Sequence, residues 1–410
     1  MKAAHFDIDI EVEQLPPAHQ TLRLAVVTET YPPEVNGVAV TLHQLVTQLQ
    51  ARGHALQLIR PRQRGEQRSP EPDPAQLLTR GIPIPRYPNL RMGLPSKRAL
   101  VRLWSWQRPD AVHIATEGPL GWSALQAASV LRLPVTSDFR TNFDVYSRHY
   151  GVGWLQAPVA AYLKKFHNRT AYTMVPTREL QAELLARGYR NVEVVMRGVD
   201  TQRFAPDWRD ASLRQSWGAG AADPVVICVG RLAAEKNLML LVRAMQSLRT
   251  RHPAAKLVLV GDGPLRAQLE AAGQGQAMVL AGEQRGESLA RHYASADIFA
   301  FPSLTETFGN VVAEALASGL AVLAYDRAAA TELIEHRVHG MKAACDNEAE
   351  FMTHLETLLD DPDLRAELGA AARQRALQLS WGSIAERFER ITVAAIQGSA
   401  AQTATSQLAT

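Results

Sequence analysis

Short apolar runs alternate with stretches of helical periodicity along most of the chain. An apolar run at 22–27 is followed by a Pro/Gly loop, by helical spacing over 38–51 and by a second apolar run at 56–59. This order predicts a strand–helix–strand unit. Because the runs are largely apolar rather than alternating with polar residues, we expect parallel strands buried on both faces of a sheet.

The same pattern continues through both halves of the chain. Further strands are expected at 111–114, 135–137 and 172–175, and then at 225–229, 256–260, 278–280, 297–301 and 320–324. Between these groups, around Asp200, the pattern lapses into a polar stretch that contains Pro206 and Trp208. We therefore predict an α/β protein with two doubly wound, Rossmann-like domains, at 22–200 and 201–380, whose parallel sheets face each other across a cleft.

Three other segments lack this pattern. Residues 1–21 are expected to form a polar N-terminal extension, the proline-rich and charged segment 61–85 an exposed loop of the first domain, and the small, polar residues 397–410 a flexible tail.

The composition agrees with two folded domains and excludes several classes of protein. A chain of 410 residues, 46% apolar and 21% charged, exceeds what one hydrophobic core usually supports. The formal net charge of +3 is too small to indicate a nucleic-acid partner. No apolar stretch approaches the roughly 20 residues that span a bilayer, and the polar start has no signal-peptide core, so we expect a cytoplasmic protein. Cys228 and Cys345 lack metal-ligand spacing and are expected to be structural thiols.

One strand-to-helix connection in the second domain has the composition of a phosphate site. It has the sequence SLTETFGN, at 303–310, in which Asn310 is expected to cap a helix over 311–317. In doubly wound sheets a ligand binds beyond the carboxyl ends of the strands. The backbone N–H groups of Phe308, Gly309 and Asn310 could therefore hold phosphate oxygens.

Two glutamates belong to the same segment, with seven residues between them. Glu306 lies on the loop and could bind sugar hydroxyls, whereas Glu314 lies inside the helix and could accept two hydrogen bonds from a ribose diol. An isolated pair at this spacing would be expected on a solvated surface. The flanking sequences SLTETFGN and AEALASG favour a nucleotide-sugar site instead.

Other strand-to-helix turns could complete this site. Arg231 and Lys236 follow the first strand of the second domain, where two fixed cations could neutralise a departing nucleoside diphosphate without a metal. Gly37 opens a helix after the first strand of the first domain, and the amides there could also face the diphosphate. Gly261, in VGDGP at 260–264, is a weaker phosphate candidate, and a purely structural turn is an equal alternative.

The sequence gives little indication of a metal or of other enzyme classes. The pairs Asp7/Asp9 and Asp361/Asp363 fall in the leading segment and a helix-initiating turn, and His336 with His339 has no further ligand at zinc spacing. We expect no protein-held metal and no cofactor. Signatures of metalloproteases, P-loop kinases and serine hydrolases are absent from the sequence.

Together these motifs resemble the retaining glycosyltransferases of family 4, and the likeness covers nearly the whole chain. It rests on TETYPPEVNG at 28–37, RGVD at 197–200, GRLAAEKN at 230–237, VGDGP at 260–264 and the Glu306/Glu314 pair. The resemblance implies the GT-B architecture of two Rossmann-like lobes and a nucleotide-sugar donor. It also implies that a final helix, at 381–396, crosses back onto the first lobe.

Roles for individual residues follow from matching positions in the family. Arg231 and Lys236 would stabilise the departing diphosphate, Glu306 would contact the donor sugar, and Glu314 would contact the ribose. Gly37 would approach the diphosphate from the first lobe. The segment TSDFRTNFDVYSRHYG at 136–151 looks like that of bacterial members described as GDP-mannose-dependent α-mannosyltransferases.

The sequence departs from the family at one position. Many relatives have a histidine between Phe and Thr in the turn at 139–141, where this chain has Arg140. A guanidinium cannot act as a general base near neutral pH, so Arg140 would bind a phosphate or an acidic acceptor, or stabilise developing charge. His113 is a second candidate on the acceptor side, and a buried histidine at a strand end is the alternative.

The expected reaction is transfer of a hexose, most readily mannose from GDP-mannose, onto a lipid or glycan hydroxyl. With no obvious carboxylate pair across the sugar, retention suggests front-face attack in which the leaving phosphate helps to remove the acceptor proton. Basic residues of the first lobe accompany Leu and Trp residues and could rest on an anionic membrane surface. They are Arg91, Lys97, Arg98, Arg102, Lys164, Lys165 and Arg169.

Three other functions remain open at this point. The donor could be a UDP-sugar, the enzyme could be a nucleotide-sugar epimerase of the same architecture, or the protein could bind a nucleotide-sugar without turnover. The epimerase would need additional acids or histidines in the cleft, and the Arg140 departure is the reason to keep the last alternative.

Overall fold

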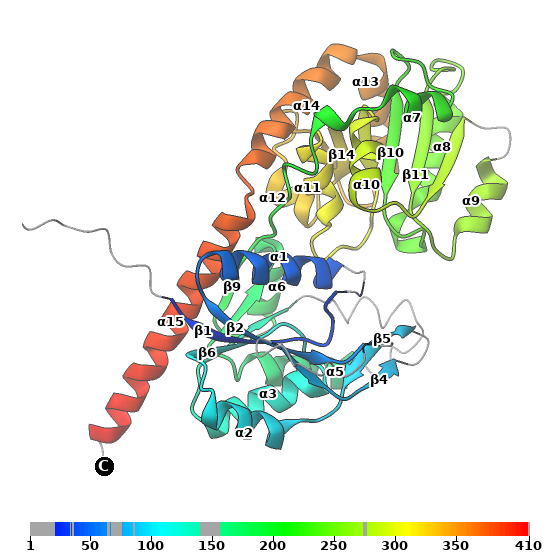
Figure 1. Ribbon diagram of the computed structural model, residues 1–410. Coiled ribbons are helices and arrows are strands. Elements are labelled where there is room, and N and C mark those ends of the chain that lie inside the picture. Colours follow the sequence, from blue (N-terminus) through cyan, green and yellow to red (C-terminus); the bar gives the residue numbers. More distant parts are fainter. Residues whose placement is uncertain are drawn as a thin grey trace, which may run out of the picture.

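The chain forms two α/β lobes, one above the other, and a long C-terminal helix that connects them (Figure 1). This computed structural model describes residues 21–32, 34, 37–63, 66, 76–84, 87–139, 156–273 and 277–408. Within that part of the chain, no helix is long and apolar enough to cross a membrane.

The first lobe is built on a seven-stranded parallel sheet with the strand order β3-β2-β1-β6-β7-β8-β9. The four residues of β6 are all buried, as expected for a strand covered by helices on both faces. Its strands are β1 (Arg23–Val27), β2 (Ala55–Pro61), β3 (Gln76–Thr79), β6 (Ala111–Ile114), β7 (Val135–Asp138), β8 (Tyr172–Val175) and β9 (Val192–Val194), with a separate antiparallel hairpin of β4 (Gly81–Ile84) and β5 (Tyr87–Gly93). Its helices are α1 (Gly37–Ala51), α2 (Lys97–Trp106), α3 (Pro119–Val130), α5 (Gln156–His167) and α6 (Arg178–Ala186).

The second lobe repeats this plan with a six-stranded parallel sheet in the order β12-β11-β10-β13-β14-β15. Its strands are β10 (Val225–Val229), β11 (Lys256–Val260), β12 (Met278–Gly282), β13 (Ile298–Phe301), β14 (Ala321–Tyr325) and β15 (Met341–Ala343). The surrounding helices are η2 (Pro206–Trp208), α7 (Ala211–Ser216), η3 (Ala234–Lys236), α8 (Leu238–Leu248), α9 (Arg266–Gly273), α10 (Gly286–Ala294), α11 (Asn310–Ala317), α12 (Ala329–Leu333), α13 (Glu348–Asp360) and α14 (Pro362–Leu377). The last helix, α15 (Trp381–Leu408), packs against the first lobe. The predicted architecture of two doubly wound lobes is therefore confirmed.

All the strands predicted from apolar runs are present, with ends that differ by two residues at most. The prediction of a loop over 61–85 is wrong where the structure describes that segment, because it contains β3 and β4. Strand β3 lies at the edge of the seven-stranded sheet and is only partly buried, and β4 belongs to the separate hairpin. Both are short, and neither has a continuous apolar run that would indicate a strand. The predicted extension at 1–21 lies outside the described residues except for Thr21.

The C-terminus also differs from the prediction. Helix α15 continues to Leu408, so the segment expected to be a flexible tail is helical to that point. The segment is rich in alanine, which has the highest helix propensity, and contains no proline.

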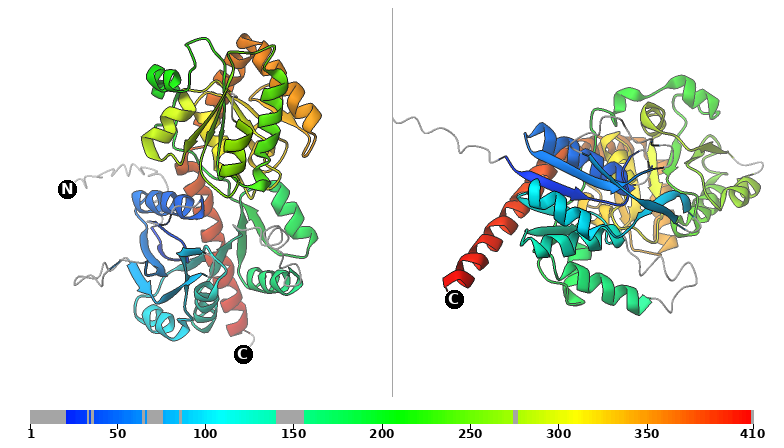
Figure 2. Two further views of the ribbon diagram at one scale, coloured as in Figure 1. Left: turned by 90° about the vertical axis from the view of Figure 1, so that its right-hand side faces the viewer. Right: turned by 60° about the horizontal axis from the view of Figure 1, so that its bottom comes forward.

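The chain crosses between the lobes twice. Val195 packs in the core of the first lobe and Val199 in that of the second, whereas Leu379 packs in the second and Ala385 in the first. The two crossings are in contact, because the N–H of Val199 donates a hydrogen bond of 3.1 Å to the carbonyl of Leu379. Beyond the second crossing, α15 runs along the first lobe (Figure 2).

An ion-paired cluster fastens α15 to the first lobe. The Glu389 carboxylate accepts hydrogen bonds from Arg52 at 2.5 and 2.8 Å and lies 2.5 Å from Nε2 of His54. Burial opposes ionisation of Glu389, but the hydrogen bonds from Arg52 and His54 outweigh it and lower the pKa of this carboxyl group. The two lobes are thus held by the chain crossings and by this charged contact.

Candidate functional site

The candidate site of the second lobe lies where the strand order of its sheet reverses. Strands β10 and β13 are neighbours, and the chain leaves them toward opposite sides of the sheet, which makes the crevice beyond their carboxyl ends the favoured ligand position. The two loops that follow these strands are joined by a hydrogen bond of 2.9 Å from the N–H of Leu304 to the carbonyl of Glu235.

Lys236 and Glu306 meet in this crevice. Nζ of Lys236 is paired with Oε1 of Glu306, and the Ser303 hydroxyl donates to the same oxygen at 3.1 Å. Lys236 also lies over the ring of Phe301, 5.3 Å from its centroid. The two charged side chains are 16% and 17% exposed, so they are shielded from solvent but still accessible to a small ligand.

Arg231 does not join this pair. Its guanidinium is paired with Glu235, four residues along the same loop, and its side chain is 39% exposed. The two cations that the sequence placed in one loop therefore pair with different carboxylates, Arg231 with Glu235 and Lys236 with Glu306.

The N-terminus of α11 differs in one detail from the prediction. Gly309, not Asn310, occupies the cap position, and its φ of +89° is a left-handed conformation that glycine adopts without strain. Asn310 is the first residue of the helix, and its side-chain oxygen accepts a hydrogen bond from Arg197 rather than capping the helix. Since glycine has no side chain, the cap residue provides no hydrogen-bond acceptor for the first N–H groups of α11.

The first lobe brings its own helix N-terminus to this place. Gly37 is the first residue of α1, and a Cβ atom on it would lie 4.0 Å from Nδ2 of Asn310. The carboxyl ends of the two sheets thus face each other, and the N-termini of α1 and α11 come together between the lobes, as the sequence predicted.

Glu314 lies one turn farther into α11 and is partly buried. Its Oε2 accepts a hydrogen bond of 2.9 Å from the hydroxyl of Tyr293, which belongs to α10. Burial raises the pKa of the Glu314 carboxyl to about 7, against the lowering effects of the Tyr293 hydroxyl and of the charge on Arg203. Sequence reasoning missed Tyr293, because only the fold brings it beside Glu314.

Gly261 serves the packing of the second lobe. A Cβ atom on it would lie 1.9 Å from the carbonyl oxygen of Gly230, and one on Gly263 would lie 2.5 Å from the carbonyl oxygen of Leu232. The glycines of VGDGP therefore let the loops after β10 and β11 pack closely, which supports the structural alternative for this turn.

On the acceptor side, His113 is a buried residue of β6 and only 2% exposed. Its Nδ1 is 3.0 Å from the Thr136 hydroxyl, and its Nε2 is 3.1 Å from Oδ2 of Asp138. Its ring meets the edge of Phe388 on α15. These contacts occupy both ring nitrogens and match the alternative of a buried strand histidine. Arg140 lies outside the described residues.

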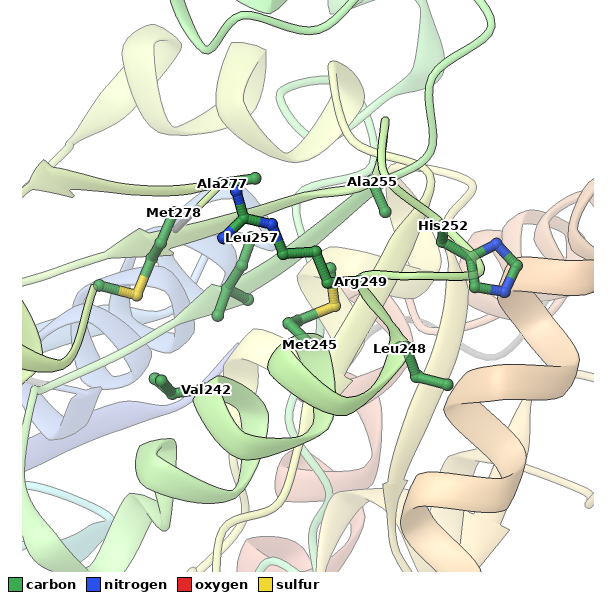
Figure 3. Close-up of a pocket in the computed structure, with 9 residues that line it drawn as sticks. All are labelled: Val242, Met245, Leu248, Arg249, His252, Ala255, Leu257, Ala277 and Met278. Carbon is green, nitrogen blue, oxygen red and sulfur yellow. The ribbon is translucent and has the colours of Figure 1, made fainter. Parts of the chain in front are cut away.

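Within the described residues, no group of three or more His, Cys, Asp or Glu side chains could hold a metal ion. A separate apolar hollow occurs in the second lobe and is lined by residues that include Val242, Met245, Leu257 and Met278 (Figure 3). It lies at the amino ends of β11 and β12, at the edge of the sheet opposite to the crevice, and so is not part of the candidate site.

Comparisons with known proteins agree with this geometry. The family described as "Glycosyltransferase Family 4" matches residues 35–203, and the one described as "Glycosyl transferases group 1" matches residues 210–375. A GDP-mannose-dependent alpha-mannosyltransferase of Mycobacterium tuberculosis is 33% identical over 90% of this chain and 95% of its own. Sulfoquinovosyl transferase SQD2 of Arabidopsis thaliana is 31% identical over 74% of this chain and 60% of its own. The structure of Anabaena HepE in complex with UDP superposes with a TM-score of 0.72 over 91% of this chain and all of its own, at 19% identity.

Proposed function

The chain belongs to the family 4 glycosyltransferases and has their GT-B fold, and from this premise we propose that it transfers mannose from GDP-mannose, with retention, to a lipid or glycan hydroxyl. That it is a glycosyltransferase follows from the family. The donor, the acceptor and the stereochemical course are the proposal.

The observation that carries the proposal is the Lys236–Glu306 pair in the crevice beside the N-terminus of α11. A donor diphosphate at that N-terminus would lie near Lys236, which would neutralise the charge that develops on the leaving group. Glu306, released from Lys236, would accept hydrogen bonds from hydroxyls of the donor sugar. Glu314 would bind the ribose, and Arg231 would add positive charge at the edge of the site.

Retention without a metal would follow from the same arrangement. The leaving phosphate oxygen and the acceptor hydroxyl would lie on one face of the sugar, so the phosphate would accept the acceptor proton while Lys236 and the helix N-termini stabilise its charge. Gly37 would bring the N-terminus of α1 to the diphosphate from the other lobe.

Incubation of the enzyme with labelled GDP-mannose and UDP-glucose, with and without a chelator, tests the proposal. We expect GDP-mannose to give a labelled product in the lipid or glycan fraction, with an α-linkage by NMR, and no loss of activity with the chelator. An epimerised donor would identify an epimerase, and binding without turnover would identify a binding protein. If neither nucleotide binds, the donor site itself is wrongly assigned.

A UDP-sugar is the second candidate donor. The fold neighbour HepE was solved in complex with UDP. Faster transfer from UDP-glucose than from GDP-mannose in the same assay would favour this alternative.

The acceptor would approach from the first lobe, and we propose that this lobe rests on an anionic membrane surface at the inner face of the membrane. Lys97, Arg98 and Arg102 are exposed on α2, and Trp106 at its end is 89% exposed. Exposed cations beside an indole are typical of helices that lie on anionic lipid.

Co-sedimentation with vesicles of phosphatidylglycerol and of phosphatidylcholine tests the membrane proposal. The double variant Arg98→Glu/Arg102→Glu should lose binding to the anionic vesicles. A control variant, Arg190→Glu/Arg285→Glu, reverses two exposed charges elsewhere and should keep it. Equal binding of the wild-type protein to both vesicles would contradict the proposal.

A further inference from the structure

Arg197 lies where both lobes and the first crossing between them meet. Its Nη1 donates a hydrogen bond of 3.2 Å to the side-chain oxygen of Asn310, the first residue of α11. Its guanidinium lies over the ring of Phe308, 5.6 Å from the centroid. A Cβ atom on Gly37, the first residue of α1, would be 3.9 Å from the same Nη1. In the sequence, Arg197 stands out only as the first residue of the RGVD motif at 197–200.

Arg197 is held in place by burial and by the packing of the neighbouring backbone. The residue is 7% exposed, and the next residue, Gly198, packs against the indole of Trp381 on the second crossing. A Cβ atom on Gly198 would be 2.8 Å from that indole, so little space remains for the backbone to move. The guanidinium is therefore held between the two helix N-termini.

This arrangement places three positive groups together. The N-termini of α1 and α11 both carry the positive end of a helix dipole, and the guanidinium adds a full charge between them. At this point the guanidinium contacts the amide of Asn310 and the ring of Phe308, both of which belong to the segment at the N-terminus of α11. Guanidinium groups bind phosphate oxygens in a bidentate manner, which Lys236 cannot do.

We propose that Arg197 is a phosphate ligand of the nucleoside diphosphate of the donor, contributed by the crossing between the lobes. The inference rests on the proposed donor site, since a diphosphate held by the N-termini of both α1 and α11 must lie beside this guanidinium. On binding, the diphosphate accepts hydrogen bonds from Arg197, and the bond to Asn310 is shared or replaced. Arg197 thereby distinguishes a nucleoside diphosphate from the corresponding monophosphate.

Calorimetric titration of the full chain with GDP and GMP, and with UDP and UMP, measures this discrimination. We expect Arg197→Gln to weaken diphosphate binding by roughly 10- to 100-fold, the range for hydrogen bonds to charged groups, and to change monophosphate binding by less than about threefold. Arg197→Met removes the charge while keeping an unbranched side chain against Phe308, and should give the same result if the glutamine variant folds poorly.

Two control variants separate this role from a structural one. Arg190→Gln removes an equal charge at the other end of β9, where the side chain is exposed, and should leave both affinities unchanged. Asn310→Ala removes the partner of Arg197, so a purely structural Arg197 would make Arg197→Gln and Asn310→Ala alike, with equal losses for diphosphate and monophosphate. That outcome, or an unchanged preference for the diphosphate in both Arg197 variants, would overturn the inference. Absence of any diphosphate binding by the wild-type protein would instead contradict the proposed donor site.

Discussion

Lys236 and Glu306 satisfy each other's charge, and a donor bound as proposed would exchange that pairing for its own contacts. Because Ser303 supports the same Glu306 oxygen, the carboxylate is already oriented toward the crevice before the sugar arrives. Such preorganisation lowers the cost of stabilising charge that develops during transfer.

Substitution of Glu306 tests its role in transfer. Glu306→Gln keeps the shape of the side chain but removes the charged acceptor for sugar hydroxyls, so we expect kcat to fall by at least roughly 100-fold. Binding of the nucleoside diphosphate should change by less than about threefold, as measured by calorimetry. Glu235→Gln is a matched control, since this carboxylate pairs with Arg231 in the neighbouring loop, and it should cost less than about tenfold in kcat. Equal, mild effects of both variants would contradict the assignment.

Glu314 predicts a pH dependence of nucleotide affinity. Its pKa of about 7 means that the carboxylate, which we propose accepts both ribose hydrogen bonds, is lost as the pH falls below 7. Since a pH one unit below the pKa leaves roughly a tenth of the groups ionised, affinity should fall roughly tenfold from pH 8 to pH 6. The variant Glu314→Gln has no titrating group at this position. Its nucleotide affinity should be lower than that of the wild type at pH 8 and should lack this part of the pH dependence. An identical slope in the variant would assign the dependence to the nucleotide instead.

The sequence predicted the site residues that follow strand ends and missed those that are brought to the site only by tertiary contacts. Gly37, Lys236 and Glu306 follow strand ends, so the rule for doubly wound sheets places them without knowledge of side-chain contacts. Tyr293 and Arg197 form hydrogen bonds with Glu314 and Asn310, which lie 21 and 113 residues away in the sequence. No local sequence pattern indicates such a pairing.

At the scale of elements, helices α6 and α12 cap each other across the lobes. The Glu332 carboxylate of α12 accepts a hydrogen bond of 2.5 Å from the N–H of Arg178 at the start of α6. The Glu179 carboxylate of α6 accepts one of 3.2 Å from the N–H of Ala328 at the start of α12. Ala328 has a φ of +50°, which is uncommon for a residue with a side chain. Ala329 then donates to the carbonyl of Phe308 at 2.8 Å, so this contact reaches the donor loop.

Removal of this cap should destabilise the protein. The Glu332 side chain is 6% exposed, so Glu332→Ala would leave the N–H of Arg178 without its acceptor and lower the free energy of unfolding by about 1–2 kcal/mol, measured in urea. Glu332→Gln keeps an acceptor oxygen and should lose less. Glu183→Ala removes a half-exposed glutamate from the same helix α6 and should stay within about 0.5 kcal/mol of the wild type. A loss for Glu332→Ala no greater than that of Glu183→Ala would contradict the capping role.

Strands in the interior of the two parallel sheets were predictable, whereas three of their four edge strands, all but β12, were not. Buried strands such as β10 and β13 consist of continuous apolar residues. The edge strands β3, β9 and β15 are only three or four residues long and include half-buried or polar positions, so their apolar pattern is too short to distinguish from a loop. Edge strands depend on their neighbour in the sheet, which the sequence alone does not identify.

For the whole molecule, the two crossings determine how the lobes face each other. Gly198 on the first crossing packs against Trp381 on the second, and the adjacent Arg197 reaches Asn310 between the lobes. A change at this contact therefore acts on the stability of the protein and on the donor site together, although Gly198 itself lies outside the crevice.

Gly198→Ala tests this coupling. The added Cβ atom would lie 2.8 Å from the ring and 3.0 Å from Cα of Trp381, so the crossings must separate, at a cost of about 1–3 kcal/mol. Separation moves Arg197 away from the N-termini of α1 and α11, so affinity for the nucleoside diphosphate should fall roughly 3- to 10-fold, with a larger radius of gyration in small-angle scattering. Gly382→Ala is the matched control, because its Cβ atom would meet only the Ser380 hydroxyl, at 3.8 Å, and alanine favours the helix. If Gly198→Ala lowers stability but leaves diphosphate affinity equal to that of Gly382→Ala, the crossings hold the lobes together without positioning the donor site.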